Sequence, residues 1–414
     1  MLLSHVGIQR LCRFVCLACL CGACISAARA EIKLIGTARL EGTSVDRSGL
    51  TGKLEGDIPQ NRLGGISAIE FTGNDHEYIL LPDRGPADGA TTYLCRFHLF
   101  KLDVDPSQTP SVMATLLKTT LLEDESGRAL TGSEAAIDND QSKALRFDPE
   151  GVRITRRGNR QGQMFISDEY GPSVYEFSET GKRTAILKVP PRFKIARPAA
   201  KAEDEIAQNT TSGRQTNGGL EGLAITPDGK KLLAAMQRPL IQESRPPKKA
   251  QDKRVGTNTR MIEIDLAKGM THEFLYPLDD TKYGVSEILT INDHEFLVLE
   301  RDGKGGPEAV AKKIYKIELA GATDISQHET LPAESIPDGV KPVQKSLFLD
   351  LLDPKFGLVG SSFPEKIEGL AFGPDLADGR RLLIVAIDND FIAEKPTLLH
   401  AFAIDRDDLP GFGW

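Results

Sequence analysis

A paired hydrophobic pattern recurs along the chain. Its clearest copy starts with an alternating apolar run at 219–226, turns at Pro227-Asp228-Gly229 and returns through the apolar run 232–236. Alternation is typical of a half-buried strand, and Pro and Gly suit the tight turn of a hairpin. The second run ends abruptly in the polar pair Gln237-Arg238. We interpret this stretch as a buried β-hairpin whose open end carries polar side chains.

Four further copies of this hairpin pattern occur at intervals of several tens of residues. They cover 65–84, 148–169, 286–301 and 367–390. All-strand units repeated at such spacing indicate a β-propeller. We therefore expect an all-β fold of about five four-stranded blades, with a sixth blade left open among the irregular stretches.

The two ends of the chain complement each other. After the last hairpin the chain has one more strand pattern, at 398–404, and then stops short of a fourth strand. An orphan strand pattern lies at 32–35, before any repeat begins. We predict that this N-terminal strand completes the last blade, because the exchange closes the ring and leaves no open sheet edge.

Residues 1–30 have the pattern of a secretory signal peptide. Arg10 and Arg13 precede the apolar run 14–20, and Ala28-Arg29-Ala30 offers a small-residue cleavage site. We expect cleavage near Ala30, a single β-propeller domain over 31–414, and a secreted or periplasmic location. Lipidation at Cys24 is the alternative. No later stretch is long and apolar enough to span a bilayer as a helix.

Cleavage changes both the cysteine count and the charge balance. Only Cys95 lies beyond residue 30, so the mature chain has no partner for an internal disulfide. The leader holds three arginines and no acidic residue, so 48 of the 51 basic residues remain against 59 acidic ones, a balance near −11. This charge argues against nucleic acid and anionic membranes as partners, and it suits a site that holds cations.

Acidic and arginine side chains stand at the open ends of the repeated hairpins. The inner strands of a propeller line its axis, and a strand's start lies at the same sheet edge as the end of its antiparallel neighbour. We expect these residues to converge on one axial face. In the first copy Ser67 has the place of the glutamate, and in the fourth copy the position of Glu287 is defined only to within one residue. The alternative is that each Glu-Gly caps a turn and each Asp-Arg forms a local ion pair.

The chemistry of this set points to a cation and an anion held side by side. Clustered carboxylates repel one another unless a cation is bound, and hard oxygen ligands suit Ca²⁺. Interleaved arginines suit an anion such as a phosphate. The expected metal ligands are Glu150, Glu221, Glu368, Asp83, Asp168 and Asp388, and the expected catalytic residues are Glu221, Arg238, Arg84 and Arg301.

Several other chemistries lack their motifs. The sequence has no G-x-S-x-G elbow, no H-E-x-x-H or H-x-H spacing and no glycine pattern of a dinucleotide or phosphate-binding loop. These absences argue against an α/β-hydrolase serine site, a zinc site and a nucleotide cofactor. Cys95 lies within an apolar strand pattern, so we expect a buried and inert thiol.

A set of short motifs, spread in order over nearly the whole mature chain, resembles one known family. The motifs are Gly64-Gly65-Ile66-Ser67, Leu81-Pro82-Asp83-Arg84-Gly85, Asp148-Pro149-Glu150-Gly151, Ser167-Asp168-Glu169-Tyr170-Gly171, Asn217-Gly218-Gly219-Leu220-Glu221-Gly222, Gln237-Arg238-Pro239-Leu240, Tyr276-Pro277-Leu278, Leu299-Glu300-Arg301-Asp302, Ile367-Glu368-Gly369 and Asp388-Asn389-Asp390. They are similar to those of the "esterase-like activity of phytase" family. The resemblance implies hydrolysis of phosphate esters or related esters.

Three functions follow for the same face. The leading expectation is a secreted, calcium-dependent phosphoesterase for a small anionic substrate, in which water attacks phosphorus at the metal and arginines neutralise the developing charge. The second is a lactonase-type or carboxyl-ester hydrolase on the same metal site. The third is a non-catalytic propeller that binds a ligand or protein. Open metal coordination would favour the enzymes, and arginine–carboxylate pairs filling the axis would favour the binding module.

Overall fold

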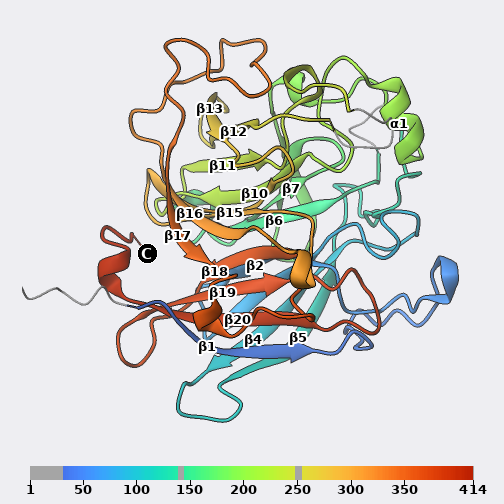
Figure 1. Ribbon diagram of the computed structural model, residues 1–414. Coiled ribbons are helices and arrows are strands. Elements are labelled where there is room, and N and C mark those ends of the chain that lie inside the picture. The colour runs from blue at the N-terminus through green and yellow to red at the C-terminus, as the bar shows by residue number, and fades with distance from the viewer. Residues whose placement is uncertain (1–30, 139–143, 248–253, 414) are drawn as a thin grey trace, which may run out of the picture.

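Twenty strands form five four-stranded antiparallel sheets in the computed structural model, which describes residues 31–138, 144–247 and 254–413 (Figure 1). Blades 1 to 4 are β2–β5, β6–β9, β10–β13 and β14–β17, and blade 5 is β18–β20 together with β1. The strands are β1 (Lys33–Leu40), β2 (Ile66–Phe71), β3 (Glu77–Pro82), β4 (Arg96–Val104), β5 (Val112–Leu121), β6 (Pro149–Ile154), β7 (Met164–Asp168), β8 (Ser173–Phe177), β9 (Arg183–Leu187), β10 (Leu220–Ile225), β11 (Lys231–Met236), β12 (Asn258–Asp265), β13 (Thr271–Pro277), β14 (Gly284–Thr290), β15 (Glu295–Arg301), β16 (Lys312–Glu318), β17 (Gln344–Asp350), β18 (Ile367–Phe372), β19 (Arg381–Ile387) and β20 (Thr397–Ile404).

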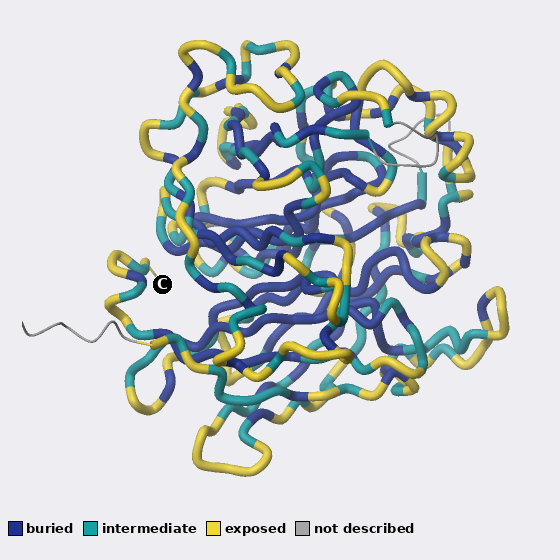
Figure 2. The backbone as a smooth tube through the Cα atoms, viewed as in Figure 1, coloured by how far each residue is buried: buried dark blue, intermediate teal, exposed yellow. Residues whose placement is uncertain are grey.

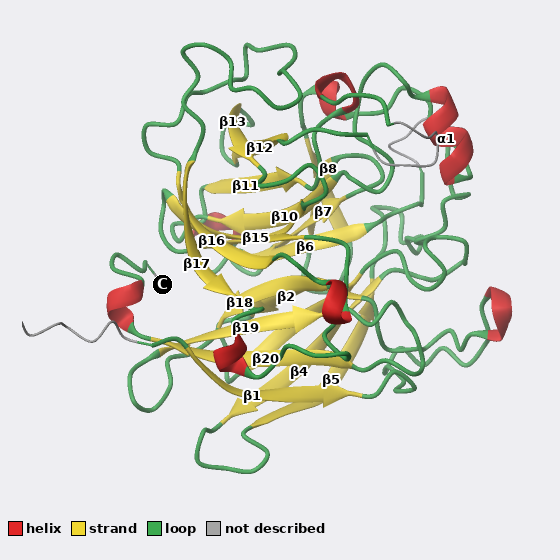
Figure 3. Cartoon of the chain, viewed as in Figure 1, coloured by secondary structure: helices red, strands yellow, loops and turns green. Residues whose placement is uncertain are grey.

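Helical structure is confined to short connections (Figure 3). The α-helix among the described residues is α1 (Ala202–Gln208), in the long segment between β9 and β10. Single 3-10 turns cover Glu55–Asp57, Gly158–Arg160, Pro191–Phe193, Ile241–Glu243, Gly306–Glu308, Pro354–Phe356 and Arg406–Asp408.

The ring is closed by the two ends of the chain. Strand β1 pairs antiparallel with β20, from Lys33 opposite Ala403 to Leu40 opposite Thr397, and the two lie side by side in Figure 1. The inner strands β2, β6, β10, β14 and β18 each contact the next, and β18 contacts β2. The predicted five-bladed propeller and its closure by the N-terminal strand are therefore confirmed, and 31–138, 144–247 and 254–413 contain no sixth sheet.

The apolar faces of the strands pack between the blades. A separate hydrophobic cluster fills each of the five interfaces between neighbouring blades, and the inner strands are buried while the outer loops are exposed (Figure 2). Cys95 is fully buried in the cluster between blades 1 and 2, and its thiol donates to the carbonyl of Phe147 at 3.4 Å. Burial also raises the pKa of this thiol well above its usual value.

Every blade has a β-bulge at the same place, near the start of its inner strand. The pairing of the first two strands slips between Ile66 and Ala68, Pro149 and Val152, Leu220 and Leu223, Val285 and Glu287, and Ile367 and Gly369. An extra residue in a bulge is unpaired, and the bulge re-aims its side chain. The residues so placed include Ser67, Glu150, Glu221, Ser286 and Glu368, which we call the bulge ring.

The glycine that follows each glutamate of the bulge ring has a packing role. A Cβ on Gly222 would lie 2.7 Å from the backbone nitrogen of Ile288, and one on Gly151 would lie 2.8 Å from the carbonyl oxygen of Glu221. These distances are shorter than real Cβ contacts, so only glycine lets neighbouring inner strands approach this closely. The repeated Glu-Gly pair thus combines an axial carboxylate with close packing of the next blade.

Candidate functional site

The bulge ring is joined by side-chain hydrogen bonds across the blades. Arg301, at the end of β15, donates from Nη2 to Glu368 Oε1 at 2.5 Å and from Nε to Ser286 Oγ at 2.9 Å. Ser67 donates to the other oxygen of Glu368 at 3.3 Å. Residues from blades 1, 4 and 5 therefore meet at the axis, with one arginine neutralising one carboxylate. The structure also fixes the register of the fourth hairpin, because Ser286 and not Glu287 is the bulge residue of blade 4.

Glu221 lies between the two halves of this face. Its side chain is buried, and burial together with repulsion from Glu169 and Glu368 raises its pKa well above the usual value. A hydrogen bond with the side chain of Glu150 acts in the opposite direction. Two neighbouring buried carboxyl groups disfavour each other's charged form, so either a shared proton or a bound cation stabilises the pair.

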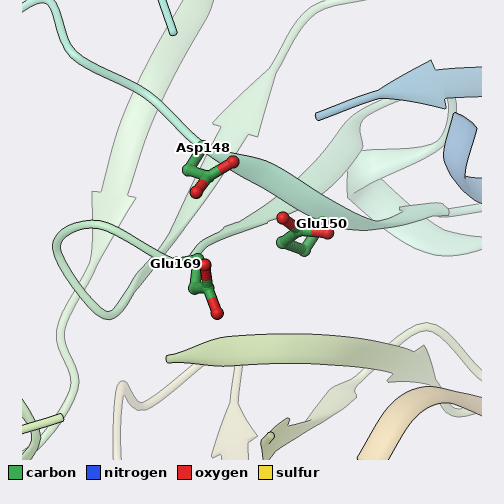
Figure 4. Close-up of side chains that lie close together, drawn as sticks. All are labelled: Asp148, Glu150 and Glu169. Atoms are coloured by element: carbon green, nitrogen blue, oxygen red, sulfur yellow. The ribbon is translucent and has the colours of Figure 1, made fainter. Parts of the chain in front are cut away.

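The closest group of carboxylates consists of Asp148, Glu150 and Glu169, which we call the acidic triad. Each offers an oxygen within 4.8 Å of the others. Figure 4 shows the three side chains together: Asp148 directly before β6, Glu150 in β6 and Glu169 directly after β7. Asp148 and Glu169 are buried and Glu150 is half-buried. Burial, with repulsion from neighbouring carboxylates, raises the pKa of Glu150 well above its usual value and also raises that of Glu169.

The acidic triad fits a divalent cation. Ca²⁺ binds oxygen ligands at about 2.3–2.6 Å, so two of its ligands lie up to about 5 Å apart. The spacing of the three oxygens matches that geometry. Carboxylates whose charged forms are disfavoured by burial gain most from a bound cation, since the cation replaces the missing solvation.

Arg84 already contacts two members of the acidic triad. Its Nη1 donates to Asp148 Oδ2 at 2.5 Å and to Glu169 Oε2 at 3.3 Å, while its Nη2 donates to Asn217 Oδ1 at 2.5 Å. The backbone N–H of Arg84 bonds the other oxygen of Asp148 at 3.1 Å. Each carboxylate oxygen has two lone pairs, so these bonds leave acceptor capacity for a metal. Asn217 ends the long segment after β9, which thereby reaches the site.

Asp83 and Asp388 face each other near Lys366, at the junction of blades 1 and 5. Asp388 Oδ2 lies 3.2 Å from Lys366 Nζ, and its Oδ1 accepts the backbone N–H of Asp390 at 2.8 Å. Burial raises the pKa of Asp388 to about 6, against the opposing effect of Lys366. Burial and then the charge of Asp388 raise the pKa of Asp83 well above its usual value.

Asp168 and Glu169 have different surroundings. Asp168 is paired with Pro149, and its carboxylate accepts backbone N–H groups of Asp148, Tyr170 and Gly171 at 3.1–3.2 Å. It also accepts the hydroxyl of Tyr175 on β8 at 3.3 Å, so its bonds are structural ones to the segments around β6, β7 and β8. The first residue of the inner strand pairs with Pro82 in blade 1, with Ile387 in blade 5 and with Asp168 in blade 2. The next residue is Asp83, Asp388 and Glu169, respectively, so Glu169 and not Asp168 is the equivalent of the other two.

Arg238 is the least neutralised cation of the axial face. No carboxylate among residues 31–138, 144–247 and 254–413 forms an ion pair with it, and its buried Nε has no hydrogen-bond partner there. Its Nη2 makes a long bond of 3.4 Å to the carbonyl of Lys282. Burial and repulsion from Arg301 lower its pKa to about 10, although Glu221 and Glu169 act in the opposite direction.

Beneath this face, a second layer of charge crosses the axis. Arg153 is buried and donates to the carbonyls of Ile69 at 3.2 Å and Ile288 at 2.7 Å, which belong to inner strands of two other blades. It also pairs with Glu287 at 3.0 Å and lies 3.7 Å from Glu70. We call Arg153, Glu70 and Glu287 the axial floor. It ties blades 1, 2 and 4 together.

The structure therefore brings together most, but not all, of the residues expected from sequence. Glu150 and Glu221 meet each other, Arg301 meets Glu368, Arg84 meets the acidic triad, and Asp83 lies with Asp388. Arg238 is placed by its electrostatic contacts with Glu221 and Glu169, and Asp168 bonds its own loop. Sequence reasoning did not select Asp148, Glu169, Asn217, Ser286 and Lys366. Asp148, Glu169 and Lys366 are sequence neighbours of chosen residues, and Asn217 begins one of the family motifs, but nothing in these patterns shows which partners they contact.

Comparison with known proteins assigns the family. The model of the phytase-like family, described as esterase-like activity of phytase, matches residues 61–391. The chain belongs to this family. A relative described as "Uncharacterized secreted protein" from Arthroderma benhamiae is 27% identical over 410 residues, covering 77% of this chain and 78% of the relative.

Solved structures give only distant similarity. An ancestral GH74 enzyme matches with a TM-score of 0.36 and 13% identity over 82% of this chain, which spans 36% of that enzyme's length. The β-propeller domain of Cps50 (Swd1) from Myceliophteria thermophila matches with a TM-score of 0.35 and 13% identity, covering 83% of this chain and 97% of that domain. Scores this low carry no argument about function.

The structure and the relative bear on location. In the part of the chain that the structure describes, no helix has the length and apolar character needed to cross a membrane. The relative is described as secreted. The predicted leader, its cleavage near Ala30 and the alternative of lipidation at Cys24 lie outside the described residues.

Proposed function

We propose that this phytase-like protein is a secreted hydrolase of small anionic esters, with phosphate esters as the substrate class and Ca²⁺ as its metal. The observation that carries the proposal is the acidic triad beside an arginine that lacks an ion-pair partner. Family membership supports ester hydrolysis, as its description includes esterase-like activity. Asp148, Glu150 and Glu169 would hold the metal, with Glu221, Glu368, Asp83 and Asp388 forming the surrounding acidic face.

The chain's own residues have distinct tasks in this proposal. When bound, Ca²⁺ supplies a Lewis acid that polarises a phosphoryl oxygen and offsets carboxylate repulsion. Arg238 binds the anionic group of the substrate, because its guanidinium has the geometry for two parallel hydrogen bonds to a phosphate. Arg84 orients Asp148 and Glu169 through the bonds described above. The Glu221 carboxyl, with its raised pKa, holds a proton for an oxygen of the reacting group.

A non-catalytic binding propeller is the second candidate, and a specific observation favours it. Arg84 and Arg301 are each bonded to carboxylates, so two of the three expected anion-binding arginines are already neutralised. Such pairs fill part of the axial face with protein–protein contacts. A protein of this kind would bind Ca²⁺ or an anion without turning it over.

A hydrolysis screen separates these functions. Protein 31–414 would be assayed against phosphate esters, carboxyl esters and lactones, with Ca²⁺ and with chelator. We expect phosphate-ester hydrolysis that requires Ca²⁺, is lost in Glu169→Gln and is retained in the control Glu179→Gln, an exposed residue in the turn between β8 and β9. Turnover confined to lactones or carboxyl esters would reassign the substrate. Calcium binding without any turnover would favour the binding module.

A further inference from the structure

A groove opens beside the axial face between blades 4 and 5. Its volume is about 670 Å³, and its walls come from 305–308, 361–366 and 387–398, with Arg39 of β1 beyond them. Lys366 and Asp388 line the groove and also belong to the axial face, so the groove adjoins that face. Pockets of about 300–1,000 Å³ accommodate small organic ligands, so the groove has room for the part of a substrate that extends beyond its reacting group.

The walls of the groove carry more negative than positive charge. The lining carboxylates are Glu308, Glu365, Asp388, Asp390 and Glu394, and the lining cations are Arg39, Lys366 and Lys395. Two of these cations are already paired, Lys366 with Asp388 and Asp390 and Arg39 with Glu41. Glu308, Glu365 and Glu394 are exposed and accessible to a ligand, and Glu308 has an exposed ion pair with Lys304 at 3.6 Å.

The axial face next to the groove is acidic as well. Carboxyl groups outnumber cations there by seven to four: Asp83, Asp148, Glu150, Glu169, Glu221, Glu368 and Asp388 against Arg84, Arg238, Arg301 and Lys366. Arg238 is the cation of this set with no ion pair to a carboxylate among the described residues. The face therefore has a place for one anionic group, and the adjoining groove has no comparable place for a second.

We infer that the substrate is a monoester with a single anionic group, bound at Arg238, and a neutral polyol or cationic remainder lying in the groove between blades 4 and 5. The inference rests on the proposed function and names its substrate class. A second phosphate on the remainder would bring about −1.5 to −2 further charges within a screening length of the groove carboxylates. Polyphosphorylated compounds are thus poor ligands for this site, in spite of the family's description.

Calorimetry with a matched pair of sugars tests the inference. Glucose 1-phosphate and glucose 1,6-bisphosphate share one ring and differ by one phosphate, so their affinities for protein 31–414 in Ca²⁺ isolate the effect of the second group. We expect glucose 1-phosphate to bind about tenfold more tightly, since like charges at this range cost on the order of 1 kcal/mol. Equal or tighter binding of the bisphosphate would overturn the inference.

Charge reversal in the groove provides the matched variants. The double variant Glu308→Lys, Glu394→Lys should remove or invert the preference, while Glu179→Lys, outside the groove, should leave it unchanged. Glu308, Glu394 and Glu179 are all exposed, so each variant should remain folded, and thermal melting would verify this. A preference that ignores the double variant would contradict the role of the groove.

The outcomes distinguish this inference from the proposed function. If neither sugar phosphate is hydrolysed but the binding preference and its response to the variants hold, the inference stands and hydrolysis fails. If both are hydrolysed with equal efficiency and bind equally, the proposed function stands and the inference fails. If glucose 1-phosphate does not bind in Ca²⁺ at all, both fail.

Discussion

Two layers of buried charge lie along the propeller axis and differ in how their charges are balanced. In the axial floor, Arg153 donates to carbonyls of other blades and pairs with Glu287 at 3.0 Å. In the axial face, seven carboxylates share four cations, and the acidic triad gathers three of the carboxylates within 4.8 Å. Buried charges are costly unless they are paired. The floor has an ion pair within the protein for Arg153, whereas the face has more carboxyl groups than cations and therefore gains from a bound cation.

The comparison teaches where stability and function are separated in this fold. The same inner strands supply both layers. The bulge residue near the start of each strand belongs to the axial face, and Arg153 and Glu70, near the ends of β6 and β2, belong to the axial floor. Substitutions in the floor should therefore act on folding, and substitutions in the face should act on binding.

The largest expected effect comes from the floor. Arg153→Met removes a side chain that bonds carbonyls of other blades and leaves the Glu287 carboxylate buried without its partner. We expect a loss of about 3–5 kcal/mol in the free energy of unfolding, measured by chemical denaturation. The double variant Arg153→Met, Glu287→Gln should recover part of it. A single variant as stable as the wild type would show that the floor is not structural.

The next effect concerns the pH dependence of the face. Glu150 and Glu221 have raised pKa values in the folded state, and that of Asp388 is about 6 against an ordinary 3.8. Folded protein thus binds more protons than unfolded protein above about pH 4. The stability from these groups is full below their unfolded pKa values and is lost as pH rises through the folded ones.

A matched variant isolates that dependence from other titrating groups. We compare the free energy of unfolding of Glu221→Gln with that of wild type in the presence of chelator. The difference should shift in favour of the variant by about 1 kcal/mol as the pH rises from 4.5 to 7, since one pKa unit corresponds to about 1.4 kcal/mol. Ca²⁺ should stabilise wild type more at pH 7 than at pH 4.5, because protons and metal compete for the same oxygens. Parallel pH profiles of the two proteins would contradict the raised pKa of Glu221.

The smallest expected change in stability comes from Arg238. Replacing it by Met removes a cation without an ion-pair partner among the described residues, so folding should change by less than about 0.5 kcal/mol. Phosphate affinity in Ca²⁺ should fall about tenfold or more, because charge-assisted bonds to an anion are lost. Ca²⁺ affinity itself should stay near that of wild type. Calorimetry of both ligands checks this, and unchanged phosphate binding would exclude Arg238 from the anion site.

The fold was predictable from sequence because its signals are local and repeated. Alternating apolar runs around turns such as Pro227-Asp228-Gly229 mark each hairpin, and the orphan strand at 32–35 matches the strand missing after Ile404. Because the hairpin pattern occurs five times, the prediction of five blades does not depend on the interpretation of any single copy.

The site was only partly predictable because the bulges shift the register. A slip of one residue moves a side chain to another face of a strand. That shift places Ser286 rather than Glu287 in the bulge ring, and it aligns Glu169 rather than Asp168 with Asp83. Partners such as Asn217 for Arg84 depend on how distant segments pack, which no local pattern encodes.

Calcium titration distinguishes the axial face from the axial floor as the place where the metal binds. Isothermal calorimetry at pH 7 would compare wild type, Glu169→Gln in the axial face and Glu287→Gln in the axial floor. Both variants replace a buried carboxyl group by an amide of nearly the same size. The account predicts that wild type binds Ca²⁺, that Glu169→Gln weakens binding at least about tenfold and that Glu287→Gln leaves the affinity unchanged. Wild-type protein that shows no heat of Ca²⁺ binding, or equal loss in both variants, would contradict it.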